Sequence, residues 1–190
     1  MNNIPGYMSE IECETLRQIF APYNKKGSIG FELGSLHGRS SVEISQAIPL
    51  GTLYCVDPWA SFDSSNADLI GTKPWIPKKG TLTTLEFFLA NTRNCKNIVP
   101  KKGRSPQDIK GWTTPVDFVF LDCKHTNPSD WDNIEFWMPK IKKGGLLSGH
   151  DFYPDRREWP DVHDNVRRLE KMLNQTVSNP KNTSIWYFTL

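Results

Sequence analysis

The segment 28–41, SIGFELGSLHGRSS, constrains the fold more than any other part of this chain. It starts as a short apolar run and continues into a glycine-rich turn, and the apolar residues of the next segment, 42–48, have the spacing of a helix. A strand, a glycine turn and a helix N-terminus usually begin the nucleotide-binding half of a doubly wound sheet. Gly34 and Gly38 can adopt backbone angles that other residues avoid, which would let a ligand approach the main chain. The unpaired N–H groups at the start of the helix would then face that ligand.

The spacing in this turn is E-x-G-x-x-x-G from Glu32 to Gly38, and it differs from the G-x-G-x-x-G of dinucleotide sites. A pyrophosphate needs many N–H donors, so its loop is rich in glycine and seldom carries an acid. A carboxylate at Glu32 would repel phosphate but would attract an ammonium group. S-adenosylmethionine carries an ammonium group and a sulfonium, and it has no phosphate. At these residues the chain resembles the class I S-adenosylmethionine-dependent methyltransferases, whose first motif is an acid followed by G-x-x-x-G. A purely structural turn is the alternative for a lone glycine pair.

Apolar runs and segments of helical spacing alternate along the rest of the chain, which predicts an α/β sheet with helices on both faces. After the first run, the predicted strands are 52–57, 97–102, 116–122, 146–152, 176–177 and 184–190. We therefore expect one domain, 1–190, with a Rossmann-like, doubly wound, seven-stranded sheet. The resemblance implies that this sheet is mostly parallel and that its last strand is antiparallel.

Three segments outside this pattern are candidates for the acceptor pocket. Segment 1–23 contains an amphipathic helix with Ser9 as its N-cap and Glu12 three residues later, and we expect it to pack on the main domain or cover the ligand. Residues 60–80 form an unusually long connection, and 153–161 form a polar loop. Because the chain is too short for an added cap domain, the pocket should come from these segments.

Composition limits the partners and the compartment. The 190 residues carry a formal net charge of +2 and scattered basic pairs, so we expect no nucleic-acid partner. The four cysteines lie far apart without a C-x-x-C pair, which indicates a reducing compartment without a zinc cage. No signal peptide and no run long enough to span a bilayer is visible, so we expect a cytoplasmic protein with no membrane partner. A homodimer is a possible assembly.

Asp57 ends the second predicted strand, 25 residues after Glu32. An acid at about this distance bonds the ribose hydroxyls in nucleotide-binding βαβ units, although Asp57 could also cap the next turn. Trp59, two residues later, could lie against adenine or help to close the substrate pocket.

Gly103 and Ser105 follow the third predicted strand. In the resembled family, a G-x-S turn at this place lies close to the adenine ring. N-capping of a helix that starts at Pro106 would also explain Ser105. With the resemblance, the predicted cofactor-binding residues are Glu32, Gly34, Ser35, Gly38, Ser40, Asp57, Trp59, Gly103, Ser105 and Asp122.

The more specific signal lies at the ends of the next two strands. Asp122 ends the most apolar run and is the second residue of L-D-C-K-H, and K-K-G-G-L-L-S-G-H-D-F follows the next helix. These runs resemble the branch of catechol-type and macrolide-sugar O-methyltransferases, so the resemblance covers roughly residues 29–152. Several members bind a divalent cation through an acid after strand four and two adjacent residues after strand five. Residue by residue, this implies a metal site at Asp122, His150 and Asp151, although relatives often carry two carboxylates where His150 and Asp151 stand.

The chemistry allows two routes to an activated acceptor. A hydroxyl is a poor nucleophile until a metal or a base removes its proton. Mg²⁺ prefers all-oxygen ligands, whereas Mn²⁺ tolerates an imidazole better. Without a metal, His150 or His125 could act as the general base. The predicted catalytic residues are therefore His150, Asp151 and His125.

The sequence thus predicts an S-adenosylmethionine-dependent methyltransferase acting on oxygen of a small molecule or sugar, with Mg²⁺ or Mn²⁺ as a possible second cofactor. One alternative is an NAD-type oxidoreductase, against which stand the acid in the first turn and the missing G-x-G-x-x-G. Another is a protein that keeps the fold and binds the cofactor without catalysis.

Overall fold

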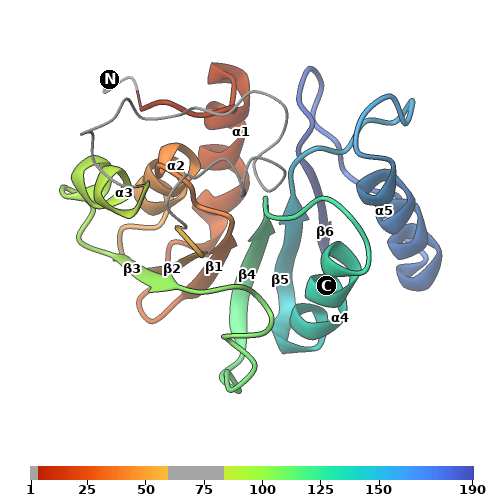
Figure 1. Ribbon diagram of the computed structural model, residues 1–190. Helices are drawn as coiled ribbons and strands as arrows, with labels where there is room; N and C mark the ends of the chain where they lie inside the picture. The colour runs from red at the N-terminus through yellow and green to blue at the C-terminus, as the bar shows by residue number, and fades with distance from the viewer. Residues whose placement is uncertain (1–3, 60–83) are drawn as a thin grey trace.

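The protein is described by a computed structural model, which covers residues 4–59 and 84–190. A six-stranded sheet runs through its middle in the order β3-β2-β1-β4-β5-β6 (Figure 1). Its strands are β1 (Ile29–Leu33), β2 (Thr52–Asp57), β3 (Ile98–Lys102), β4 (Val116–Leu121), β5 (Ile141–Gly149) and β6 (Trp186–Thr189). All neighbouring strands pair in parallel except β5 and β6, which are antiparallel. The strand order changes direction between β1 and β4, where doubly wound sheets bind their ligands.

The predicted α/β class and the antiparallel last strand are confirmed, but the described part of the chain has six strands and not seven. The segment 176–177 forms no strand, and the pairing there is one isolated bridge between Ser178 and Tyr187. A segment of two residues offers too few backbone pairs for a ladder of its own. The fifth strand is longer than predicted, because it already begins at Ile141, before the glycine pair.

Helices cover both faces of the sheet (Figure 1). They are α1 (Glu10–Phe20), α2 (Arg39–Ala47), α3 (Thr84–Thr92), α4 (Ser129–Trp137) and α5 (Pro160–Leu173). The side chains of β4 alternate between the two layers, because successive residues of a strand point to opposite faces. Phe118 and Phe120 pack with α1, α2 and α3, whereas Val119 and Leu121 pack with α4 and α5. This strand is therefore buried on both sides, as its apolar sequence predicts.

Helix α1 begins with the predicted capping box. The Ser9 hydroxyl accepts a hydrogen bond from the Glu12 backbone N–H, and the Glu12 carboxylate accepts one from the Ser9 backbone N–H. Two ion pairs join α1 to α2, Arg39 with Glu10 and Arg17 with Glu43. The N-terminal helix therefore packs on the helix that follows the glycine turn.

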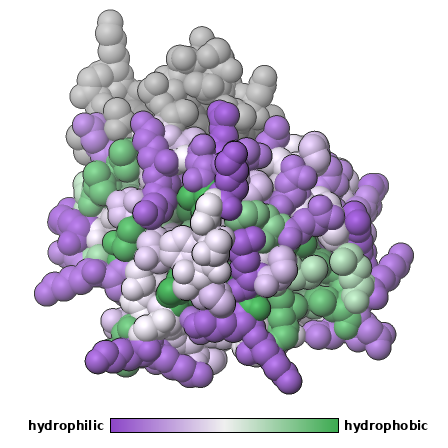
Figure 2. All heavy atoms as spheres, turned by 90° about the horizontal axis from the view of Figure 1, so that it is seen from below, coloured by the Kyte–Doolittle hydropathy of each residue, from purple (hydrophilic) through white to green (hydrophobic). Residues whose placement is uncertain are grey.

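The outer surface is of mixed polarity. Figure 2 shows the side that lies below in Figure 1, where hydrophilic side chains cover much of the face and smaller apolar patches lie between them. None of the helices in segments 4–59 and 84–190 has the length and apolar character needed to cross a bilayer.

Candidate active site

The site lies at the edge where the parallel strands end. Gly34 (φ 91°) and Gly38 (φ 86°) both take left-handed backbone angles in the turn between β1 and α2. A Cβ atom on Gly34 would lie 1.9 Å from the Asp122 carbonyl oxygen, and one on Gly38 would lie 2.8 Å from Cγ2 of Thr92. Both glycines are therefore required by the packing of the turn itself. The turn and the end of β4 touch, which brings the predicted cofactor segment next to Asp122.

Glu32 points beneath the turn and is fully buried. The Ser40 hydroxyl donates to its Oε1 at 2.5 Å, and the Ser41 hydroxyl donates to its Oε2. Burial raises the pKa of Glu32, and these hydroxyl donors oppose the rise. Glu32 thus anchors the first turn of α2. Ser40, one of the predicted cofactor-binding residues, forms part of this anchor through its hydrogen bond to Glu32. Ser35, the next predicted residue, is also buried in the turn.

Asp57 holds the other side of the same turn. Its Oδ2 accepts the Leu36 backbone N–H at 3.0 Å, and its Oδ1 accepts the Trp59 backbone N–H at 2.6 Å. Burial raises the pKa of Asp57, while these N–H donors lower it. A carboxylate offers about four acceptor positions and the backbone donors of Leu36, Trp59 and Ser35 use three, so the residue can still accept from a hydroxyl. Leu36 (φ 42°) and Trp59 (φ 37°) take left-handed angles beside it, and such local strain is often found at functional sites.

Trp59 is more buried than expected of a residue that closes a pocket. Its indole N–H donates to the Leu36 carbonyl at 2.8 Å, and its ring packs against Phe88 at a centroid distance of 4.7 Å. Only 3% of the residue is exposed. Trp59 therefore stabilises the turn through its hydrogen bond to Leu36.

Gly103 and Ser105 lie at the end of β3, but no helix starts at Ser105. Residues 105–111 form turns, so the predicted N-cap role is wrong. Instead, the Ser105 hydroxyl accepts from the Trp137 indole N–H at 2.9 Å, and the carboxylate of Asp108 accepts the Arg104 backbone N–H at 2.8 Å. Gly103 donates its backbone N–H to the carbonyl of Asp57 at 3.0 Å, which ties this turn to the end of β2.

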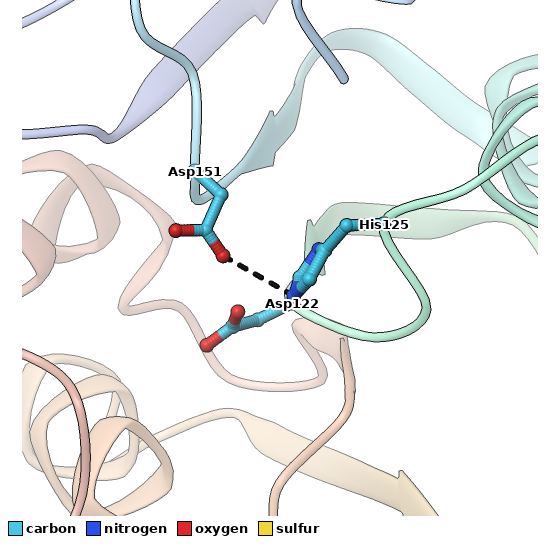
Figure 3. Close-up of side chains that lie close together, drawn as sticks. All are labelled: Asp122, His125 and Asp151. Atoms are coloured by element: carbon cyan, nitrogen blue, oxygen red, sulfur yellow. Dashed lines mark ion pairs between the residues drawn. The ribbon is translucent and has the colours of Figure 1, made fainter. Parts of the chain in front are cut away.

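Asp122, His125 and Asp151 gather at the ends of β4 and β5. One potential ligand atom from each lies within 4.8 Å of the others, and His125 Nε2 is 3.2 Å from Asp151 Oδ2. Figure 3 shows His125 and Asp151 turned toward one another from two loops, with the Asp122 carboxylate beside them. All three are partly exposed, unlike Glu32, and the backbone of Asp151 takes a left-handed angle (φ 62°). Two carboxylates and an imidazole in this arrangement can hold a divalent cation.

His150 lies behind this group and is 7% exposed. Its Nδ1 is 3.6 Å from Asp122 Oδ1 and 3.4 Å from Asp151 Oδ2. Its Nε2 is 3.0 Å from Glu12 Oε1. Burial alone would lower the pKa of His150, but the three carboxylates raise it well above its ordinary value. In turn, burial would raise the pKa of Asp151, and His150 and His125 lower it.

The sequence predicts His150 as the histidine of the site at Asp122 and Asp151. In the structure His125 lies beside these two acids, and His150 contacts them from behind. It also adds Glu12, which the sequence indicated only as a capping residue. No signal in the sequence links Glu12 to His150, because the two lie far apart in the chain and meet only through the fold.

The sheet order and the acidic edge together define a Rossmann-like α/β protein whose site suits a cationic ligand. A family described as a methyltransferase domain matches residues 31–152, from β1 to the residues that follow β5. The chain belongs to this family, and it is an S-adenosylmethionine-dependent methyltransferase. This membership decides against the oxidoreductase alternative.

Solved structures share the fold at low sequence identity. An O-methyltransferase from Bacillus cereus, solved with SAH (S-adenosylhomocysteine), is 15% identical, with a TM-score of 0.61 over 99% of this chain and 85% of its own. A candidate methyltransferase from Streptococcus mutans, also solved with SAH, is 16% identical, with a TM-score of 0.59 over 96% of this chain and 97% of its own. An rRNA methylase from Streptococcus thermophilus is 13% identical, with a TM-score of 0.56 over 96% of both chains. At such identities the likeness establishes the fold and not the acceptor.

Proposed function

We propose that this methyltransferase methylates an oxygen of a small molecule or sugar, assisted by a divalent cation held at Asp122 and Asp151 with a histidine. The observation that carries the proposal is the cluster of Asp122, His125 and Asp151 beside the turn of β1 and α2. When bound, a divalent cation lowers the pKa of a coordinated hydroxyl and holds it in place. A mixed set of carboxylate and imidazole ligands favours Mn²⁺ over Mg²⁺.

The negative charge of the site matches the positive charge of S-adenosylmethionine. Asp57, Asp122 and Asp151 are acids at one edge, and a sulfonium with an ammonium group is attracted to such an edge. In this proposal Asp57 accepts from the ribose hydroxyls with its free lone pairs. The turn of Gly34, Ser35 and Gly38 borders the amino-acid end, for which Glu32 supplies negative charge from below. Gly103 and Ser105 border the adenine.

The same residues then orient the acceptor. Methyl transfer is an in-line displacement. The protein therefore contributes chiefly by placing the acceptor oxygen in line with the bond between the sulfonium sulfur and its methyl carbon. The histidine that does not hold the cation can receive the acceptor's proton. His125 is better placed for this, because it lies on the accessible side of the group, whereas His150 is buried and bonded to Glu12 through Nε2. Of the segments assigned to the acceptor pocket, 60–80 lies outside the described residues. In segment 153–161, Trp159 packs on the ring of His125 at a centroid distance of 4.6 Å.

A thermal-shift screen tests this proposal. We expect SAH and S-adenosylmethionine to raise the melting temperature and NAD to leave it unchanged, because a ligand that binds only the folded state stabilises that state. Mn²⁺ should add a further rise that Asp122→Asn abolishes. A panel of phenols, sugars and amines, with a ribosomal RNA fragment as the competing class, then identifies the acceptor. Methylation of the RNA alone, or of amines alone, would contradict the proposal. Sedimentation of the same sample tests whether the protein is a homodimer.

A further inference from the structure

Glu12 is more than the end of a capping box. Its Oε2 accepts the Ser9 backbone N–H at 2.9 Å and the Ser9 hydroxyl at 2.8 Å, which completes the box. Its Oε1 accepts three further hydrogen bonds at 3.0 Å, from the Ser184 N–H, the Ser184 hydroxyl and His150 Nε2. Only 7% of the residue is exposed. One carboxylate therefore joins the N-terminal helix, the segment before β6 and the end of β5.

A capping role does not require this second set of contacts. The Ser9 contacts use Oε2 alone, and an exposed glutamate satisfies a capping box as well as a buried one. Burying a carboxylate carries a desolvation cost, which is offset only when donors surround it. Here all the groups hydrogen-bonded to the carboxylate are donors, and one of them is the ring of a histidine that faces the acidic cluster.

The contact with Glu12 decides which nitrogen of His150 faces the site. A carboxylate accepts and does not donate, so Nε2 must carry a hydrogen. The other nitrogen, Nδ1, then points between Asp122 and Asp151 at 3.6 and 3.4 Å. Histidines that bind metals usually donate their second ring N–H to a carboxylate or carbonyl, which fixes the ring and its tautomer. The pair of Glu12 and His150 has this arrangement.

We propose that Glu12 is a positioning residue, which holds the ring of His150 so that Nδ1 is presented to the cation site at Asp122 and Asp151. This inference rests on the proposed function. It places two histidines around the same acids, His125 from the loop after β4 and His150 from behind. It also gives the N-terminal helix a part in the site, since Glu12 reaches it directly.

Two matched variants separate positioning from folding. Glu12→Ala and Ser9→Ala both break the capping box, but only Glu12→Ala removes the acceptor of His150 Nε2. The first readout is the ring N–H signal of His150 in proton–nitrogen NMR, assigned by its loss in His150→Asn. We expect this signal in the wild type and in Ser9→Ala, and its loss in Glu12→Ala because the proton then exchanges with water. If Glu12→Ala does not fold, Glu12→Gln replaces it, with a shifted signal as the expected result.

The second readout is the affinity for Mn²⁺ alone, measured by calorimetry. Loss of an outer partner of a metal-binding histidine typically weakens binding about tenfold to hundredfold. We expect this loss in Glu12→Ala and a change below about twofold in Ser9→Ala. An unchanged His150 signal, or equal Mn²⁺ affinities in the two variants, would overturn the inference. A wild type that binds SAH but no Mn²⁺ would instead refute the cation in the proposed function, and the NMR signal would still decide the role of Glu12.

Discussion

The two halves of the site edge use acids in opposite ways. On the side of β1 and β2, the carboxylate of Glu32 is buried and that of Asp57 is partly exposed, and both accept hydrogen bonds from the turns beside them. On the side of β4 and β5, Asp122 and Asp151 are partly exposed and face histidines. All four come from equivalent strand ends, so position alone does not set their task. In the proposed function, the first pair therefore shapes the turn that borders the cofactor, and the second pair meets the reacting groups.

The largest effect should come from the exposed pair. Asp122→Asn keeps the shape of the side chain but removes the charge, so we expect methyl transfer to fall at least about a hundredfold. The melting temperature should fall less than in Glu32→Ala, because Asp122 is partly exposed and loses only its charge pair with His150. Rates with a fixed acceptor and unfolding scans of the same preparation measure both. If Asp122→Asn lost as much stability as Glu32→Ala, the two halves of the site edge would no longer differ in their contribution to folding.

The opposite result is expected for Glu32. Glu32→Ala would leave a cavity and two buried serine hydroxyls without their acceptor, which should cost about 3 kcal/mol of unfolding free energy or more. Urea unfolding measures this, with Ser41→Ala as a matched control that should cost about 1 kcal/mol. If Glu32→Ala were as stable as the wild type and only its affinity for SAH fell, Glu32 would be a ligand contact and not an anchor.

Asp57 lies between these extremes, since it both holds the turn and keeps lone pairs for a ribose. Asp57→Asn retains an acceptor oxygen but loses the charge and presents an amide to one of the two N–H donors. We expect SAH binding to weaken about tenfold, the equivalent of one lost hydrogen bond to a charged group. Calorimetry with SAH measures this. Unchanged affinity would limit Asp57 to holding Leu36 and Trp59 in place.

Local features were predictable from the sequence, whereas features that join distant segments were not. The capping box of Ser9 and Glu12 and the buried strand β4 follow from neighbouring residues, and both are confirmed. The prediction of a helix start at Ser105 is wrong, because Ser-Pro is typical of N-caps and the competing partner of Ser105, Trp137, comes from the distant helix α4.

The same limit applies to the site. Strand-end acids could be placed at one edge because parallel strands end together. Which histidine would lie on the accessible side could not be deduced, since this depends on the course of the loops after β4 and β5. The contact of His150 with Glu12 joins the first helix to the fifth strand, and no local pattern encodes such a contact.

The smallest expected effect is the loss of stability at acid pH that the buried carboxylate of Glu12 causes. Burial would raise the pKa of Glu12, but His150, Ser184 and Ser9 lower it below the ordinary value. A carboxylate with a depressed folded pKa stabilises the protein above its unfolded pKa, about 4.3, and this stabilisation is lost as the pH falls through the folded pKa. Each unit of depression contributes about 1.4 kcal/mol at neutral pH. We therefore expect the stability gap between wild type and Glu12→Gln to be largest at pH 6 and to shrink below pH ~4. Urea unfolding across this range measures the gap, and a gap independent of pH would mean that Glu12 contributes through its shape and not through its charge.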